Sequence, residues 1–138
     1  MITAYTDGAC RVSNPGLCSA SFVVYKDNAK YHEQGRVLEG RHTNNESEYT
    51  ALLDLLEWLY AQSIRNVVIH SDSKLVVNQT LHNWECNGLL RPLRDKAYGL
   101  FINGCHILKH VKGHEGNVGN EAADALCNAL LDKYQGGV

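Results

Sequence analysis

Residues 43–72, which read TNNESEYTALLDLLEWLYAQSIRNVVIHSD, decide the fold. Thr43-Asn44-Asn45-Glu46 matches the capping-box pattern, in which Thr43 is the N-cap residue and Glu46 reaches back to it. The apolar residues that follow recur at helical spacing: Ala51, Leu52, Leu55, Leu56 and Leu59. Val67-Val68-Ile69 is a short apolar run, typical of a parallel strand that is buried on both faces. A capped helix that leads into such a strand predicts an α/β crossover unit.

The segment before this helix predicts three strands. Residues 2–7 alternate between polar and apolar side chains, and the triplet Thr6-Asp7-Gly8 is expected to end this first strand. Asn14-Pro15-Gly16 is a turn signal, and residues 21–25 (SFVVY) follow as the second strand. Asp27-Asn28 then turns the chain into residues 30–38, which predicts an antiparallel hairpin.

The segment after residue 72 adds helices and one more strand. Residues 73–81 and 90–101 predict helices, residues 107–111 predict a strand, and residues 119–133 predict the last helix. The order of elements predicts an α/β fold with a mixed five-stranded sheet, in which three strands are antiparallel and two are parallel. Helices are expected on both faces of the sheet, and residues 1–138 are expected to form a single domain.

Composition limits the function without deciding it. No apolar run is long enough to span a bilayer, and the N-terminus lacks a basic stretch followed by an apolar core, so no membrane association is expected and a cytoplasmic protein is predicted. The five cysteines are odd in number and form no C-x-x-C pair, which predicts reduced thiols rather than a disulfide framework or a zinc site. The net charge of -2 argues mildly against nucleic-acid binding, although an acidic metal site beside a basic surface would give the same total.

Four carboxylates are candidates for chemistry, and each also has a structural explanation. Asp7 suits a turn, Asp72 suits the N-cap of the following helix, and Asp124 suits a solvated helix edge. Glu48 suits the positive end of the helix dipole. However, Glu48 continues the apolar face of its helix while Glu46 already serves the cap, so its position favours a functional role.

Convergence of these carboxylates would require a cation. Each close pair of like charges costs on the order of 4 kcal/mol at a surface-like dielectric constant. Asp72 lies at the carboxyl end of a parallel strand, where open α/β sheets place their ligands. A site made only of oxygen ligands suits Mg2+ or Mn2+ better than zinc.

At this point the sequence resembles the type 1 ribonuclease H family. The resemblance is carried by Tyr-Thr-Asp-Gly-Ala-Cys at 5–10, Asn-Pro-Gly at 14–16, Thr-Asn-Asn-Glu-Ser-Glu at 43–48, His-Ser-Asp-Ser at 70–73, His-Asn-Trp at 82–84, Val-Lys-Gly-His at 111–114 and Asn-Glu-Ala-Ala-Asp at 120–124. These segments appear in the family's order and span nearly the whole chain. The resemblance implies the ribonuclease H-like fold and cleavage of the RNA strand of RNA–DNA hybrids, with 5′-phosphate and 3′-hydroxyl products.

The resemblance also implies a metal site made of Asp7, Glu48, Asp72 and Asp124. Two Mg2+ ions would act there, with Mn2+ as a substitute; Asp7 would bridge them, one ion would activate the attacking water and the other would stabilise the leaving oxygen. His114 matches the family's mobile-loop histidine, whose implied role is proton transfer and help with product release. The alternative for His114 is an exposed loop residue without a catalytic role.

Further residues match the family's substrate contacts. Arg41, Thr43 and Asn83 match a phosphate pocket that grips the DNA strand. Asn14, Asn44 and Asn45 match residues in the minor groove of the hybrid, where 2′-hydroxyls distinguish RNA from DNA. The set of predicted substrate-binding residues is completed by Lys74, Trp84 and Asn120.

The chain departs from the family pattern in three places. The stretch from Asp7 to Asn14 is one residue longer than usual. Lys74 stands where a glutamine that reads the hybrid is common. Residues 85–90 are short and poor in charge where many members carry a basic protrusion, so a reduced substrate-binding element is expected.

Several alternatives remain open from the sequence. The same fold could serve as a non-cleaving hybrid-binding module, as a ribonuclease H domain derived from a reverse transcriptase, or as a resolvase or integrase. A small-molecule α/β enzyme is a further alternative, but no G-x-G-x-x-G or G-x-x-x-x-G-K loop is present. The residues indicate no obligatory protein partner, and a monomer is expected.

Overall fold

The computed structural model describes residues 1–11, 13–113 and 116–136. Within these residues the chain forms five strands and four helices. In order they are β1 (Ile2–Arg11), β2 (Leu17–Lys26), β3 (Ala29–Val37), α1 (Asn44–Ala61), β4 (Val68–Ser71), α2 (Lys74–Thr80), α3 (Leu90–Asn103), β5 (Ile107–His110) and α4 (Val118–Gly136). Every predicted element is present, in the predicted order.

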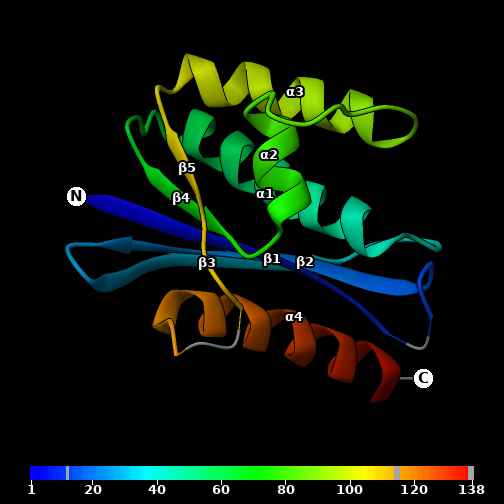
Figure 1. Ribbon diagram of the computed structural model, residues 1–138. Coiled ribbons are helices and arrows are strands. Elements are labelled where there is room, and N and C mark those ends of the chain that lie inside the picture. Colours follow the sequence, from blue (N-terminus) through cyan, green and yellow to red (C-terminus); the bar gives the residue numbers. More distant parts are fainter. Residues whose placement is uncertain (12, 114–115, 137–138) are drawn as a thin grey trace.

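The strands form one mixed sheet in the order β3-β2-β1-β4-β5. The β1–β2 and β2–β3 pairs are antiparallel, whereas β1–β4 and β4–β5 are parallel. Figure 1 shows α1, α2 and α3 over one face of the sheet and α4 across the other. The predicted fold class and the predicted helices on both faces are therefore confirmed.

Strand β1 is longer than the sequence pattern indicates. Its pairing with β2 runs without interruption from Ile2 opposite Lys26 to Arg11 opposite Leu17. Asp7 consequently lies inside the strand, and the expectation that it stands at the strand's end is wrong. The physical reason is that Gly8 and Ala9 carry little side chain and hide the alternation, although their backbones pair as regularly as the rest.

The two faces of the sheet are covered by different means. On the α1 side, buried leucines of the helix pack against strands β1 and β2; those with no exposed surface are Leu52, Leu55 and Leu59. On the α4 side, polar groups also take part, because Ser19 and Ser21 of β2 donate hydrogen bonds of 2.9 and 2.7 Å to the carbonyl oxygens of Cys127 and Ala123. Among the described helices, none is long and apolar enough to cross a lipid bilayer.

The cysteines differ from the prediction at one pair. Cys10 and Cys18 face each other across β1 and β2 and form a disulfide, with a Cα–Cα distance of 4.0 Å. Cys86, Cys105 and Cys127 are free thiols. The expectation of five reduced thiols is wrong for this pair, because cross-strand pairing depends on the register of the hairpin and not on the spacing of cysteines in the sequence.

Candidate active site

Asp7 projects from the middle of the central strand β1. Its carboxylate is buried, with only 4% of the residue exposed, and Oδ1 accepts a hydrogen bond of 3.0 Å from the backbone N–H of Gly8. The same N–H also donates to Oε1 of Glu48. A single backbone donor therefore lies between the carboxylates of Asp7 and Glu48.

Glu48 is held by the first turns of α1. The predicted capping box is present, since Thr43 Oγ1 accepts from Glu46 N–H and Glu46 Oε1 accepts from Thr43 N–H, each at 3.1 Å. Glu48 itself takes no part in the cap. It lies on the sheet-facing side of the helix and is 9% exposed, so the explanation by the helix dipole alone does not account for its burial.

Gly8 brings the β1 strand and the α1 helix into backbone contact. A Cβ atom at this position would lie 2.5 Å from the carbonyl carbon of Ser47 and 2.6 Å from the nitrogen of Glu48. Glycine is thus required here, because the backbones of β1 and α1 lie too close together to leave room for a side chain. The contact fixes the distance between the backbones that carry Asp7 and Glu48.

Asp72 follows the carboxyl end of β4. The N-cap of α2 is Ser73, whose Oγ accepts a hydrogen bond of 3.2 Å from Val76 N–H. The alternative in which Asp72 is the cap is therefore wrong, and the Asp72 carboxylate remains available at the end of the strand. Gly113 approaches it closely, since a Cβ there would lie 3.1 Å from Asp72 Oδ2.

Three of the four predicted carboxylates come together. One carboxylate oxygen from each of Asp7, Glu48 and Asp72 lies within 4.8 Å of the other two, and among the described residues these three form the candidate group for a metal ion. Asp124 stands on α4, outside this group, where the side-chain amide of Asn128 lies 3.4 Å from its Oδ1. Asp124 nevertheless acts on the site, because it contributes to the raised pKa of Asp7.

Burial and the repulsion from neighbouring carboxylates raise the pKa of Asp7 and of Glu48. Burial, followed by the charge of Asp72, raises the pKa of Asp7 from 3.8 to about 8. Burial, followed by the charges of Asp7 and Asp72, raises the pKa of Glu48 well above its ordinary value. The described residues place no lysine or arginine ion pair on these carboxylates. Desolvated oxygen ligands in this arrangement fit a hard divalent cation, which would take the place of the protons.

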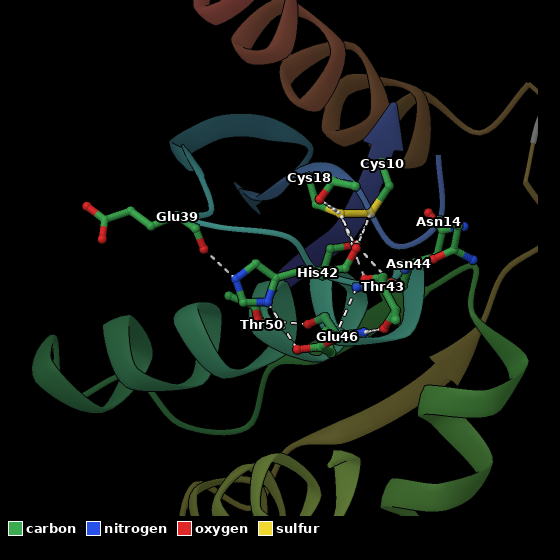
Figure 2. A network of polar contacts seen from close by, with 11 residues as sticks. Cys10, Asn14, Cys18, Glu39, His42, Thr43, Asn44, Glu46 and Thr50 are labelled. Atoms are coloured by element: carbon green, nitrogen blue, oxygen red, sulfur yellow. Dashed lines mark hydrogen bonds and ion pairs between the residues drawn. A yellow bond between two sulfur atoms is a disulfide. The ribbon is translucent and has the colours of Figure 1, made fainter. Parts of the chain in front are cut away.

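Of the predicted substrate contacts near the start of α1, Asn14, Thr43 and Asn44 lie in one polar network (Figure 2). Asn14 Oδ1 accepts a hydrogen bond of 3.0 Å from Asn44 N–H, and Arg41 donates one of 2.9 Å to the carbonyl oxygen of Pro15. Thr43 serves as the cap, as described. Asn45 is exposed on the first turn of the helix. The structure thus joins the loop after β1 to the N-terminus of α1.

The other predicted contacts lie around α2. Lys74 is exposed on the first turn, and Asn83 donates a hydrogen bond of 3.2 Å to Asn78 Oδ1. Trp84 is 48% exposed and borders an open groove of about 400 Å³, together with Asn83 and Arg91. Asn120 differs from the rest, since it is only 3% exposed and its buried Oδ1 has no hydrogen-bond partner among the described residues. Its burial favours a supporting position over direct contact with a hybrid.

A buried polar network behind this groove was not predicted from the sequence. Gln79 accepts a hydrogen bond of 2.7 Å from the hydroxyl of Tyr49 and donates one of 2.9 Å to the carbonyl oxygen of Glu85. Arg94 donates to the Gln79 carbonyl oxygen at 3.2 Å. Gln79 thereby links α1 to the loop that carries Trp84. The only signal in the sequence is a glutamine on the apolar side of a short helix, which is too common to be informative.

The prediction for His114 falls outside the described residues, as does Glu115 beside it. The neighbouring Gly113 and Gly116 are described, and Gly116 has a left-handed backbone with φ of 76°. His70, which was given no catalytic role, stacks on Tyr5 with ring centroids 4.6 Å apart.

Comparison with known proteins agrees with this geometry. The ribonuclease H family model matches residues 1–131. The ribonuclease H of Ruthia magnifica is 31% identical, over 96% of this chain and 96% of that protein. Among solved structures, RNase H1 from the archaeon Halobacterium salinarum has a TM-score of 0.85 and 35% identity, covering 96% of this chain and 98% of that one. LC11-RNase H1, solved in complex with an RNA/DNA hybrid, has a TM-score of 0.86 and 26% identity, covering 98% and 99%. The match along nearly the whole chain, together with the fold, shows that this chain belongs to the ribonuclease H family, as a type 1 member.

Proposed function

We propose that this chain is an endonuclease that hydrolyses the RNA strand of RNA–DNA hybrids and leaves 5′-phosphate and 3′-hydroxyl ends. The observation that carries the proposal is the cluster of Asp7, Glu48 and Asp72, each of which places one carboxylate oxygen within 4.8 Å of the others. A hybrid bound to LC11-RNase H1, a structural neighbour over nearly the whole chain, supports the substrate class. Residues 1–138 would act as one catalytic domain.

Asp7, Glu48, Asp72 and Asp124 are the residues that would hold the metal ions. When bound, two Mg2+ ions, or Mn2+ in their place, would supply an activated water and neutralise the charge on the leaving oxygen. Asp7 is central in the sheet, and its carboxylate interacts with those of Glu48, Asp72 and Asp124, which supports its role as the central ligand of the site. Asp124 belongs to α4, which crosses the face of the sheet opposite α1 (Figure 1), so it would approach the site from the α4 side.

The chain's own residues would position the substrate and move protons. Asn14, Asn44 and Asn45 would contact the minor groove of the hybrid from the exposed edge beside α1, where all three are exposed. Arg41, Thr43 and Asn83 would hold a phosphate of the DNA strand, and Trp84 would support its backbone. His114 would transfer a proton near neutral pH and assist product release.

A cleavage assay tests this proposal directly. A labelled RNA–DNA hybrid should be cut in the RNA strand when Mg2+ is present and remain intact with a chelator. RNA–RNA and DNA–DNA duplexes of the same sequence should remain intact in both conditions. Binding of hybrid without metal-dependent cleavage would support the alternative of a non-catalytic module. Cleavage that requires an added reverse transcriptase domain would support the alternative of a derived domain.

A further inference from the structure

The Cys10–Cys18 disulfide lies directly beneath the edge to which we assign hybrid binding. Cys18 of β2 has no exposed surface, whereas Cys10 of β1 is partly exposed. Figure 2 shows the two sulfur atoms against the backbone of His42 and Thr43, where the chain enters α1. The disulfide is therefore positioned to support the start of this helix.

Both sulfur atoms lie against the same backbone group. The Sγ atoms of Cys10 and Cys18 are 3.7 and 3.1 Å from the carbonyl oxygen of His42. Cys18 Sγ also lies 3.5 Å from the carbonyl oxygen of Gly16 and 3.9 Å from that of Thr43. A displacement of either sulfur must therefore displace the segment that contains His42.

This segment is connected to the loop after β1 by hydrogen bonds. His42 and Gly16 pair through their backbones, with N–O distances of 2.9 and 3.0 Å. Asn14 accepts from Asn44 N–H, one residue beyond the cap Thr43. The side chain of His42 is also occupied, because its ring nitrogens contact Glu46 Oε2 at 3.0 Å and the carbonyl oxygen of Glu39 at 2.6 Å. The loop, the helix start and the disulfide are thus joined by one continuous set of contacts.

We propose that Cys10–Cys18 is a thiol-exchange site whose disulfide form positions Asn14, Thr43 and Asn44 for the hybrid. A thiol of the glutathione class is the co-reactant. Its thiolate attacks the partly exposed Cys10 Sγ, the sulfur–sulfur bond breaks, and Cys18 Sγ leaves with the electron pair and takes a proton. A second thiol then displaces Cys10 from the mixed disulfide. In total, two external thiols are oxidised to one disulfide, and the protein disulfide is reduced to two thiols.

The consequence of reduction follows from the packing. Two sulfur atoms that lose their bond must separate to van der Waals contact. Cys18 has no room to move, since it is fully buried against three backbone carbonyl groups. The displacement therefore falls on Cys10, whose Sγ also lies 3.9 Å from Ser47 Oγ, and on His42, and through His42 on the hydrogen bonds to Gly16 and on the Asn14–Asn44 contact. The carboxylates are less affected, because the contact at Gly8 holds Asp7 against Glu48.

The inference rests on the proposed function, because it assigns this edge to the hybrid. It predicts that reduction raises the KM for hybrid about 3-fold to 10-fold, since binding groups are misplaced, while kcat changes by less than about 2-fold. Protein equilibrated with oxidised or reduced glutathione should be assayed with Mg2+ and labelled hybrid. Alkylation under denaturing conditions should label three cysteines in the oxidised protein and five in the reduced one. Amide hydrogen exchange of Gly16, His42 and Asn44 provides a measurement that does not depend on cleavage and should accelerate on reduction.

Two variants serve as controls. The double variant Cys10→Ala/Cys18→Ala should have the KM of the reduced protein in both buffers; if it does not fold, Cys10→Ala alone also removes the disulfide. Cys105→Ala removes an exposed free thiol elsewhere and should keep the full response to glutathione. An equal KM in the two buffers, a response that persists without Cys10, or five labelled cysteines after oxidation would overturn the inference. If neither form cleaves hybrid but amide exchange still responds, the proposed function fails while the positioning role of the disulfide stands.

Discussion

Replacement of Asp7 by asparagine should abolish cleavage and, without metal, stabilise the fold in a pH-dependent way. The variant Asp7→Asn keeps the size of the side chain, and its amide oxygen can still accept from Gly8 N–H. It removes the charge that burial and the repulsion from Asp72 disfavour. Cleavage should be lost because a neutral amide is a poor ligand for a divalent cation.

The magnitude follows from the raised pKa of Asp7, which is about 8 in the folded protein against an ordinary value of 3.8. Each tenfold change in an equilibrium constant corresponds to about 1.4 kcal/mol, so full ionisation of Asp7 costs the folded state at most about 6 kcal/mol. Between these two pH values the folded protein binds more protons than the unfolded chain, and stability therefore falls as pH rises. The wild-type protein should lose stability from about pH 4 to about pH 8, and the variant should lose less.

The assay is urea unfolding in a chelator, monitored by tryptophan fluorescence at about pH 5 and about pH 9. The variant should gain at least about 2 kcal/mol over wild type at the higher pH and much less at the lower pH. Addition of Mg2+ should stabilise the wild-type protein more than the variant. The exposed Asp132, which pairs with Arg11, provides a control: Asp132→Asn should change stability by less than about 1 kcal/mol, with no gain at high pH. A variant that is no more stable than wild type at about pH 9, or that cleaves hybrid near the wild-type rate, would refute the reasoning.

Three further predictions concern turnover and binding. His114→Ala should lower kcat about 10-fold to 100-fold and leave Mg2+ affinity nearly unchanged, as expected for a proton-transfer residue; a large loss of metal affinity by calorimetry would mean that its role is misassigned. Gln79→Met leaves the Tyr49 hydroxyl and the Glu85 carbonyl unpaired, so the free energy of unfolding should fall by about 1 to 3 kcal/mol. KM should rise while kcat is retained, and an equal loss of kcat and of kcat/KM would contradict a role in holding the loop. Insertion of a Lys/Arg-rich helix between Asn87 and Arg91 should lower KM, keep kcat nearly constant and steepen the salt dependence of binding. Nanomolar binding of hybrid by the unmodified protein at physiological salt would show that no such addition is needed.

The prediction for the inserted basic helix is supported by the ion pairs that the basic residues of α3 already form. The Arg94 guanidinium is buried and pairs with Asp95 at 2.7 Å, and Lys96 pairs with Glu57 at 3.2 Å. Both residues belong to the few basic side chains that follow residues 85–90. Composition cannot show that a basic side chain is already engaged, because the partner is chosen by the packing of α3 against its neighbours. Arg91, on the exposed side of α3, has a longer ion pair with Asp95, at 3.8 Å, and remains the better candidate.

The sequence was sufficient for the architecture because the decisive signals are local. The capping box at Thr43 and the apolar run at 67–69 act within a few residues, and both were found where expected. The ends of the helices and strands were harder to predict, as the continuation of β1 past Asp7 shows. A strand is extended by pairing with its neighbour, and that pairing is invisible in a stretch of small residues such as Gly8-Ala9.

The site was predictable in its members but not in its arrangement. Motif context selected Asp7, Glu48 and Asp72, which the structure places together. The competition between Asp72 and Ser73 for the cap could not be decided, since both residue types cap helices well and the choice depends on the direction of each side chain. The disulfide was missed for a related reason: Cys10 and Cys18 meet only when the register of β1 and β2 is known.

The contact at Gly8 has a consequence for how such a protein can be altered. Because no side chain separates the two backbones, a substitution at Gly8 cannot bring the carboxylates closer together, and any larger residue would push strand and helix apart. The loops at 13–16 and 81–89, in contrast, would hold the duplex through exposed side chains such as Asn14 and Trp84. Protein engineers could therefore replace these loops to change which duplex is accepted, and the spacing needed for hydrolysis would carry over without being designed again.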